Sequence, residues 1–191
     1  MKIRNILLLT VCISIVSACG QGPKDVHAMK TKIPWTIKLL VTGNGSSATM
    51  NVNTGPMNGC INAQNGCMVF KKGEKGEVTF EMIGNHGNFH ITQLKFCKGA
   101  APPVPLSADC VLGDNADDFY VEKPNGVKTN PDKNTGKIVW PYSDGIKTFV
   151  LHNKNDVRQE YYYMVIACDG ADPATSNCPP ADPPLDNKGK N

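Results

Sequence analysis

The chain has 191 residues, with 20 basic and 17 acidic side chains and 40% hydrophobic residues. This near balance of charge, without a cluster of Lys and Arg, excludes the strongly basic surface that nucleic-acid-binding proteins use. No phosphate-cradling glycine loop, Gly-x-Ser-x-Gly sequence or His-Glu-x-x-His sequence occurs, which argues against the common catalytic sites. We therefore predict a non-enzymatic protein with no cofactor and no nucleic-acid partner.

The N-terminus has the order of a secretory signal. Two cations, Lys2 and Arg4, precede an apolar run of eleven residues from Ile6 to Val16, and the small residues Ser17 and Ala18 follow. The run is well short of the roughly 20 apolar residues that a membrane-spanning helix needs. The pattern predicts that residues 1–18 are a signal peptide that is cleaved.

The sequence Val16-Ser17-Ala18-Cys19 resembles the lipobox of bacterial lipoproteins. The resemblance implies that Cys19 receives a diacylglycerol thioether, that the signal is cut before it, and that its new amino group is acylated, with palmitate as a typical chain. Two or more acyl chains anchor a protein stably. Gly20 is not the Asp that retains such proteins in the inner membrane. We therefore expect a protein anchored in the outer membrane, facing the periplasm or the cell surface.

Cysteine usage predicts a disulfide framework. Of the eight cysteines, Cys12 leaves with the signal peptide and Cys19 takes lipid, so six remain in an exported chain. Six cysteines allow 15 connectivities. We favour pairing between sequence neighbours, because each such pair brackets a stretch rich in Gly, Pro, Asn or Ala. The expected pairs are Cys60–Cys67, Cys97–Cys110 and Cys168–Cys178.

Residues 19–33 mix Gly, Pro, Lys and Asp without periodicity, and they predict a lipidated, flexible tether. The folded part begins near Pro34. Alternating polar and apolar residues over 35–42 and 48–52, on either side of Asn44-Gly45, predict a β-hairpin.

Further short runs with strand character recur between turn-forming residues, and no window shows sustained helical periodicity. They predict an all-β protein, a single β-sandwich of about seven to nine strands over residues 34–168, immunoglobulin-like or cupredoxin-like. The run over 160–168 is apolar on both faces, which favours a central strand over an exposed stripe of tyrosines. The runs are 77–83, 88–97, 118–122, 137–142, 146–152 and 160–168.

Residues 169–191 are rich in proline. Proline cannot donate to a β-ladder, so this segment is not expected to pair as a central strand. We predict a tail that runs over the surface of the sandwich.

Two features of known sandwiches are missing. Cupredoxins place a His and then a Met shortly after the Cys ligand, and neither follows Cys97 or Cys168. The immunoglobulin disulfide would join Cys97 to Cys168, but Trp140 lies too far after Cys97 and the residue two places before Cys168 is not Tyr. Neither the blue-copper site nor the immunoglobulin signature is predicted.

Metal ligands are few. His86 and His90 lie in one turn-to-strand segment, and with Asp117 or Asp118 they could hold copper or zinc, but two histidines alone are too few. Residues 114–118 and 130–136 resemble calcium loops, although neither has the full set of oxygen ligands. Solvated turns are the preferred interpretation of both segments.

The leading hypothesis is a lipid-anchored envelope protein that binds an envelope protein or a cell-wall ligand through its loops or an exposed sheet face. One alternative is a periplasmic metal-binding sandwich that uses His86 and His90. Another is an inhibitor of an envelope-targeting hydrolase. A hydrolase with an unrecognised site is a third alternative.

Overall fold

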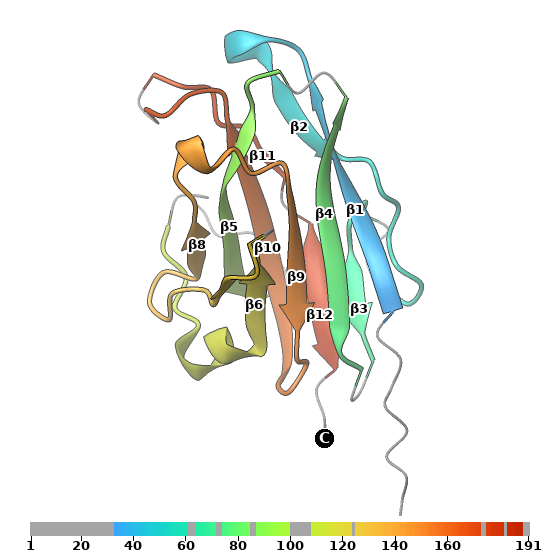
Figure 1. Ribbon diagram of the computed structural model, residues 1–191. Helices are drawn as coiled ribbons and strands as arrows, with labels where there is room; N and C mark the ends of the chain where they lie inside the picture. The colour runs from blue at the N-terminus through green and yellow to red at the C-terminus, as the bar shows by residue number, and fades with distance from the viewer. Residues whose placement is uncertain are drawn as a thin grey trace, which may run out of the picture.

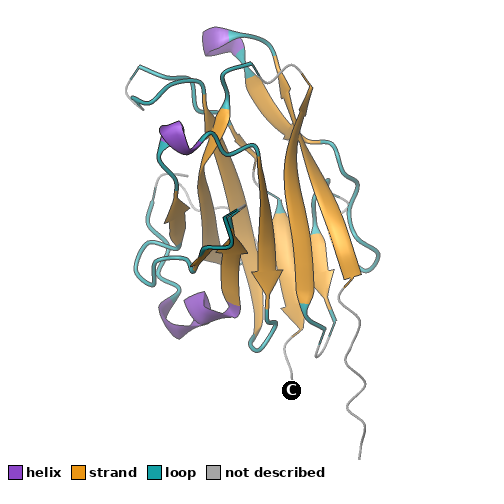
Figure 2. Ribbon diagram, in the orientation of Figure 1, coloured by secondary structure: helices purple, strands orange, loops and turns teal. Residues whose placement is uncertain are grey.

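Two β-sheets pack face to face in the computed structural model, and short loops and 3₁₀ turns join the strands (Figures 1 and 2). The signal peptide, Cys19, most of the predicted tether and His86 lie outside the described residues. In the described part of the chain, no helix is long and apolar enough to cross a membrane. The structure describes residues 33–60, 64–71, 74–84, 87–99, 108–123, 125–172, 175–181 and 183–188.

All eight strands predicted from the sequence are present. The predicted total of seven to nine is too low, because the described residues contain twelve strands. Three of the four additional strands have only two or three residues, too few to show a periodic pattern. The strands are β1 Ile33–Thr42, β2 Thr49–Val52, β3 Met68–Phe70, β4 Gly76–Gly84, β5 His90–Lys98, β6 Phe119–Glu122, β7 Lys128–Thr129, β8 Lys137–Val139, β9 Thr148–Asn153, β10 Arg158–Cys168, β11 Pro180–Ala181 and β12 Pro184–Lys188. The 3₁₀ turns are η1 Gly45–Ser47, η2 Gly113–Asp118 and η3 Tyr142–Asp144.

Both sheets mix parallel and antiparallel pairs. The first sheet has the strand order β2-β1-β4-β9-β6-β7, and the second has the order β3-β12-β10-β5-β8, with β11 also paired to β10. The parallel pairs are β1 with β4 and β12 with β3. The architecture is therefore the predicted all-β sandwich.

The predicted hairpin is confirmed as the antiparallel pair β1–β2. Thr42 pairs with Thr49, so the connection is six residues long and contains η1. The positive φ of 85° lies at Gly43, just before the Asn44-Gly45 pair. A side chain at Gly43 would also meet the Ser47 carbonyl oxygen, so glycine suits this turn.

Inward-facing side chains of the two sheets form one core. Phe96 of β5 stacks on Phe119 of β6 with ring centroids 4.4 Å apart, and this contact joins the two sheets. Burying one such ring stabilises the fold by about 1.5–3 kcal/mol. β10 is covered on both faces, as predicted: Tyr161 and Tyr163 point into the core, and Tyr162 packs against Cys97 and Cys110 on the opposite face.

The prediction of a surface tail over residues 169–191 is wrong for its second half. β12 lies between β3 and β10, and the side chain of Leu185 is buried. Pro184 is the first residue of its strand, where a missing N–H is tolerated, and residues 185–188 contain no proline. The sandwich therefore extends to Lys188 instead of ending at Cys168.

The three predicted disulfides are present: Cys60–Cys67, Cys97–Cys110 and Cys168–Cys178. The immunoglobulin-type pair of Cys97 with Cys168 is excluded, because both residues have other partners.

Candidate functional site

His90, one of the two histidines proposed as metal ligands, contacts η3. Its Nδ1 lies 3.0 Å from the carbonyl oxygen of Tyr142, and its ring packs on the Tyr142 ring at 4.5 Å. Because a carbonyl oxygen can only accept a hydrogen bond, Nδ1 carries the proton. No group of three His, Cys, Asp or Glu side chains that could hold a metal occurs within the described residues.

The acidic residues proposed beside those histidines hold loops together. Asp117 and Asp114 both pair with Lys133, at 3.3 Å and 3.1 Å. Asp118 is buried and accepts the N–H groups of Asp156 and Val157. Burial raises the pKa of the Asp118 carboxyl above its usual value, although the two backbone donors oppose this effect.

The segment 130–136 is a turn organised by Asp132. Its carboxylate accepts the N–H groups of Asn134 and Thr135 and the Thr135 hydroxyl, and these donors lower the pKa of Asp132. Lys133 joins this turn to η2 through Asp114. The segment 130–136 is thus a turn, as preferred from the sequence, whereas residues 114–118 belong to the 3₁₀ turn η2, in which Ala116 and Asp118 are buried.

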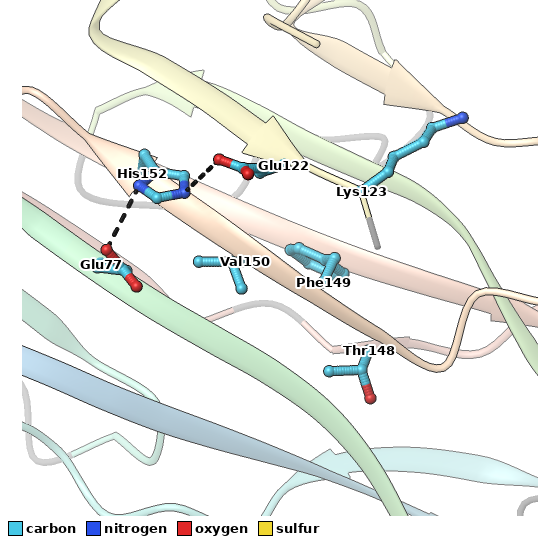
Figure 3. A pocket seen from close by; sticks show the side chains of 7 residues that line it. All are labelled: Glu77, Glu122, Lys123, Thr148, Phe149, Val150 and His152. Carbon is cyan, nitrogen blue, oxygen red and sulfur yellow. Dashed lines mark ion pairs between the residues drawn. The ribbon is translucent and has the colours of Figure 1, made fainter. Parts of the chain in front are cut away.

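A different cluster lies on the outer face of the first sheet, where His152 sits between two glutamates from the neighbouring strands (Figure 3). His152 Nδ1 is 3.8 Å from Glu77 Oε2 on β4, and its Nε2 is 3.5 Å from Glu122 Oε2 on β6. The His152 side chain is only 11% exposed. These groups border a hollow of about 380 Å³, which we call the outer hollow. It is lined by Glu77, Glu122, Lys123, Thr148, Phe149, Val150 and His152.

Strand alternation and register build this cluster. On β9, Leu151 points into the core, so its neighbours Val150 and His152 point outward. In the ladders, His152 lies opposite Glu77 on one side and opposite Tyr120 on the other. Cross-strand neighbours on one face lie about 4.5–5.5 Å apart, which brings their side chains into contact.

Aromatic and cationic groups complete the surroundings of His152. The Tyr120 ring is nearly parallel to the imidazole at 4.4 Å, and Lys128 Nζ lies 5.2 Å from the Tyr120 ring centroid. Lys123 extends away from both glutamates in Figure 3 and pairs with Asp144 at 3.1 Å. The two carboxylates are within ion-pair range of the ring, one at each nitrogen.

The geometry suits a proton better than a metal ion. A histidine binds a metal through one ring nitrogen, and the other ligands then gather around that nitrogen. Here the two carboxylates face different nitrogens, so they cannot share one metal with this ring. An imidazolium, by contrast, carries an N–H at both nitrogens and attracts both carboxylates at once.

Sequence reasoning placed His152 near a strand end but did not connect it to Glu77 or Glu122. His152, Glu77 and Glu122 each occupy an outward position on a strand with alternating burial, and this pattern is the feature of the sequence that indicates a shared outer face. The connection depends on the order β4-β9-β6, which brings together residues 75 and 30 positions apart in the chain. Strand order is a property of the whole sandwich, so local patterns do not reveal it.

No protein-family model and no curated protein matches this chain. Among solved structures, it is similar to a laccase from Botrytis aclada, with a TM-score of 0.36 and 11% identity over 78% of this chain and 28% of the laccase. It is also similar to McoA multicopper oxidase from the hyperthermophile Aquifex aeolicus, with a TM-score of 0.30 and 8% identity over 78% of this chain and 29% of that chain. The chain spans less than a third of the length of either oxidase, and these similarities assign it no activity.

Proposed function

We propose that this chain is a lipid-anchored, non-enzymatic binding protein of the bacterial envelope, held in the outer membrane by Cys19. The observation that carries the proposal is the lipobox-like sequence Val16-Ser17-Ala18-Cys19 in front of a sandwich whose six other cysteines are all paired. Disulfides persist in oxidising compartments outside the cytoplasm, so the paired cysteines support the same extracytoplasmic location as the lipobox-like sequence.

The tether gives the domain a limited reach from the membrane. Ile33, the first residue of β1, lies fourteen positions after Cys19. At about 3.3–3.6 Å per residue, a fully extended segment of this length spans at most roughly 50 Å. The sandwich would therefore meet partners close to the membrane surface.

We assign the binding surface to the outer hollow. It combines the outward-facing apolar side chain of Val150 with charged groups at its border, and such a mixture of apolar and polar contacts can recognise a partner. Its groups stand on strands of a sheet, which hold them more rigidly than loops would. An envelope protein or a cell-wall ligand with a protruding group is the kind of partner that fits.

The anchor is tested by expressing the full chain and a Cys19→Ala variant in a lipoprotein-processing bacterium with labelled palmitate. We expect the label and the membrane association only in the unmodified chain. Equal membrane association of the two forms would contradict the anchor.

The binding surface is tested separately by placing a photo-reactive amino acid at Thr148, on the border of the outer hollow. The matched control carries it at Thr36, which is exposed on β1 of the same sheet. A cross-link expected at 148, absent at 36 and reduced by Glu122→Gln would support binding at the hollow. Equal cross-linking at both positions, or none at 148, would remove the hollow from the proposal.

A further inference from the structure

We propose that Glu77, His152 and Glu122 form a proton-dependent lock across strands β4, β9 and β6 that sets the charge and shape of the outer hollow. The regulatory role of the lock rests on the proposed binding at the hollow, whereas the lock itself does not. Its existence can be measured in the protein without a partner.

The lock follows from the donors and acceptors present. Ionised carboxylates only accept hydrogen bonds, and a neutral imidazole donates from one nitrogen and presents a lone pair at the other. With Glu77 facing Nδ1 and Glu122 facing Nε2, the neutral ring leaves one carboxylate opposite a lone pair. Only the imidazolium attracts both strands, and both separations are within ion-pair range.

The groups that face His152 reinforce this dependence. β4 contributes Glu77, and β6 contributes Glu122 together with the Tyr120 ring. Of the lysines on the same side of the sheet, Lys128 Nζ lies 5.2 Å from the Tyr120 ring centroid, and Lys123 is paired with Asp144. Two nearby negative charges favour the charged form of histidine, while burial opposes it.

The consequence is a hollow with two charge states. With His152 protonated, the three groups sum to one negative charge, and the carboxylates are held against the ring. With His152 neutral, the sum is two negative charges, and one of the two carboxylates faces the lone pair of the ring. Histidine is the side chain that makes this change in the physiological pH range.

The experiment is an NMR titration of the mature protein with ¹³C-labelled histidine rings and labelled valine methyl groups. The His152 signal is assigned by its loss in His152→Gln. We expect its midpoint to move to lower pH in Glu77→Gln and in Glu122→Gln, and further in the double variant. The midpoint of His90, on the second sheet, should stay in place and serves as the internal control.

The methyl signals of Val150 report on the hollow itself. They should shift with the same midpoint as His152 in wild type and lose this pH dependence in His152→Gln. A His152 midpoint that neither glutamine substitution moves, or a Val150 response that persists without the histidine, would overturn the lock. Because glutamine keeps the shape of glutamate and the backbone ladder is untouched, the variants should remain folded, and their amide spectra verify this.

Discussion

At the scale of single residues, Asn155 is the most constrained position in the described chain. It is fully buried and has a positive φ of 51°, the one non-glycine residue there in that conformation. Its side-chain Nδ2 donates to the carbonyl oxygens of Lys71 and Glu74 at 2.7 Å and 3.0 Å. One side chain thus ties the β9–β10 turn to the loop before β4.

Replacing Asn155 should show both parts of this role. In Asn155→Ala, the carbonyl groups of Lys71 and Glu74 lose their donor and the backbone keeps a conformation that costs an ordinary residue about 1–2 kcal/mol. We expect the free energy of unfolding to fall by about 2–4 kcal/mol, measured by urea denaturation. Asn155→Gly relieves the backbone and should lose less. Equal losses in the two variants would show that the conformation contributes nothing.

The raised pKa of Asp118 predicts how the stability of the fold changes with pH. Burial raises its folded pKa above the unfolded value of 3.8, so the folded state binds more protons between the two values. The free energy of unfolding contributed by this group therefore falls as the pH rises through that interval. The difference in the free energy of unfolding between wild type and Asp118→Asn should shrink over the same pH interval and stay constant above it. A difference that grows with pH would show that the Asp156 and Val157 donors outweigh burial.

At the scale of elements, side chains from two disulfide-closed loops form hydrogen bonds with the edge of β2 that does not pair with β1. Asn53 N–H bonds to the Lys38 carbonyl on β1, so by alternation the backbone groups of Ala48, Met50 and Val52 point away from β1. The Val52 carbonyl accepts Nδ2 of Asn65, and the Ala48 carbonyl accepts Nδ2 of Asn177. These asparagines belong to the loops closed by Cys60–Cys67 and Cys168–Cys178.

Exposed strand edges promote pairing between molecules. We therefore expect the double variant Asn65→Ala/Asn177→Ala to associate at concentrations where wild type is monodisperse, as measured by sedimentation velocity. Asn51→Ala is the matched control, because Asn51 is exposed on the same strand but its backbone groups face β1. Association of the control to the same extent would show that the asparagine caps do not protect the edge.

At the scale of the whole molecule, sequence patterns located what is local and missed what depends on strand order. Short runs with strand character predicted β1, β4 and β10, and the pairing of cysteines that are neighbours in the sequence predicted the three disulfides. The pairing of β1 with β4 in parallel was not visible, because nothing in either strand specifies its neighbour. The Glu77–His152–Glu122 cluster was missed for the same reason. β12 was missed because the prolines before it argued against a strand, although they end where its pairing residues begin.

The position of β12 inside the second sheet predicts that this strand stabilises the fold. It joins β3 to β10, and Leu185 is buried in the core. Leu185→Ala should lower the free energy of unfolding by about 2–5 kcal/mol, the cost of removing a buried leucine. Leu40→Ala is the matched control, because Leu40 is only half-buried on β1 and should lose much less. If both variants lost the same small amount of unfolding free energy in chemical denaturation, the C-terminal segment would contribute little to the stability of the sandwich. A large loss at Leu185 alone would make it the strand that completes the second sheet.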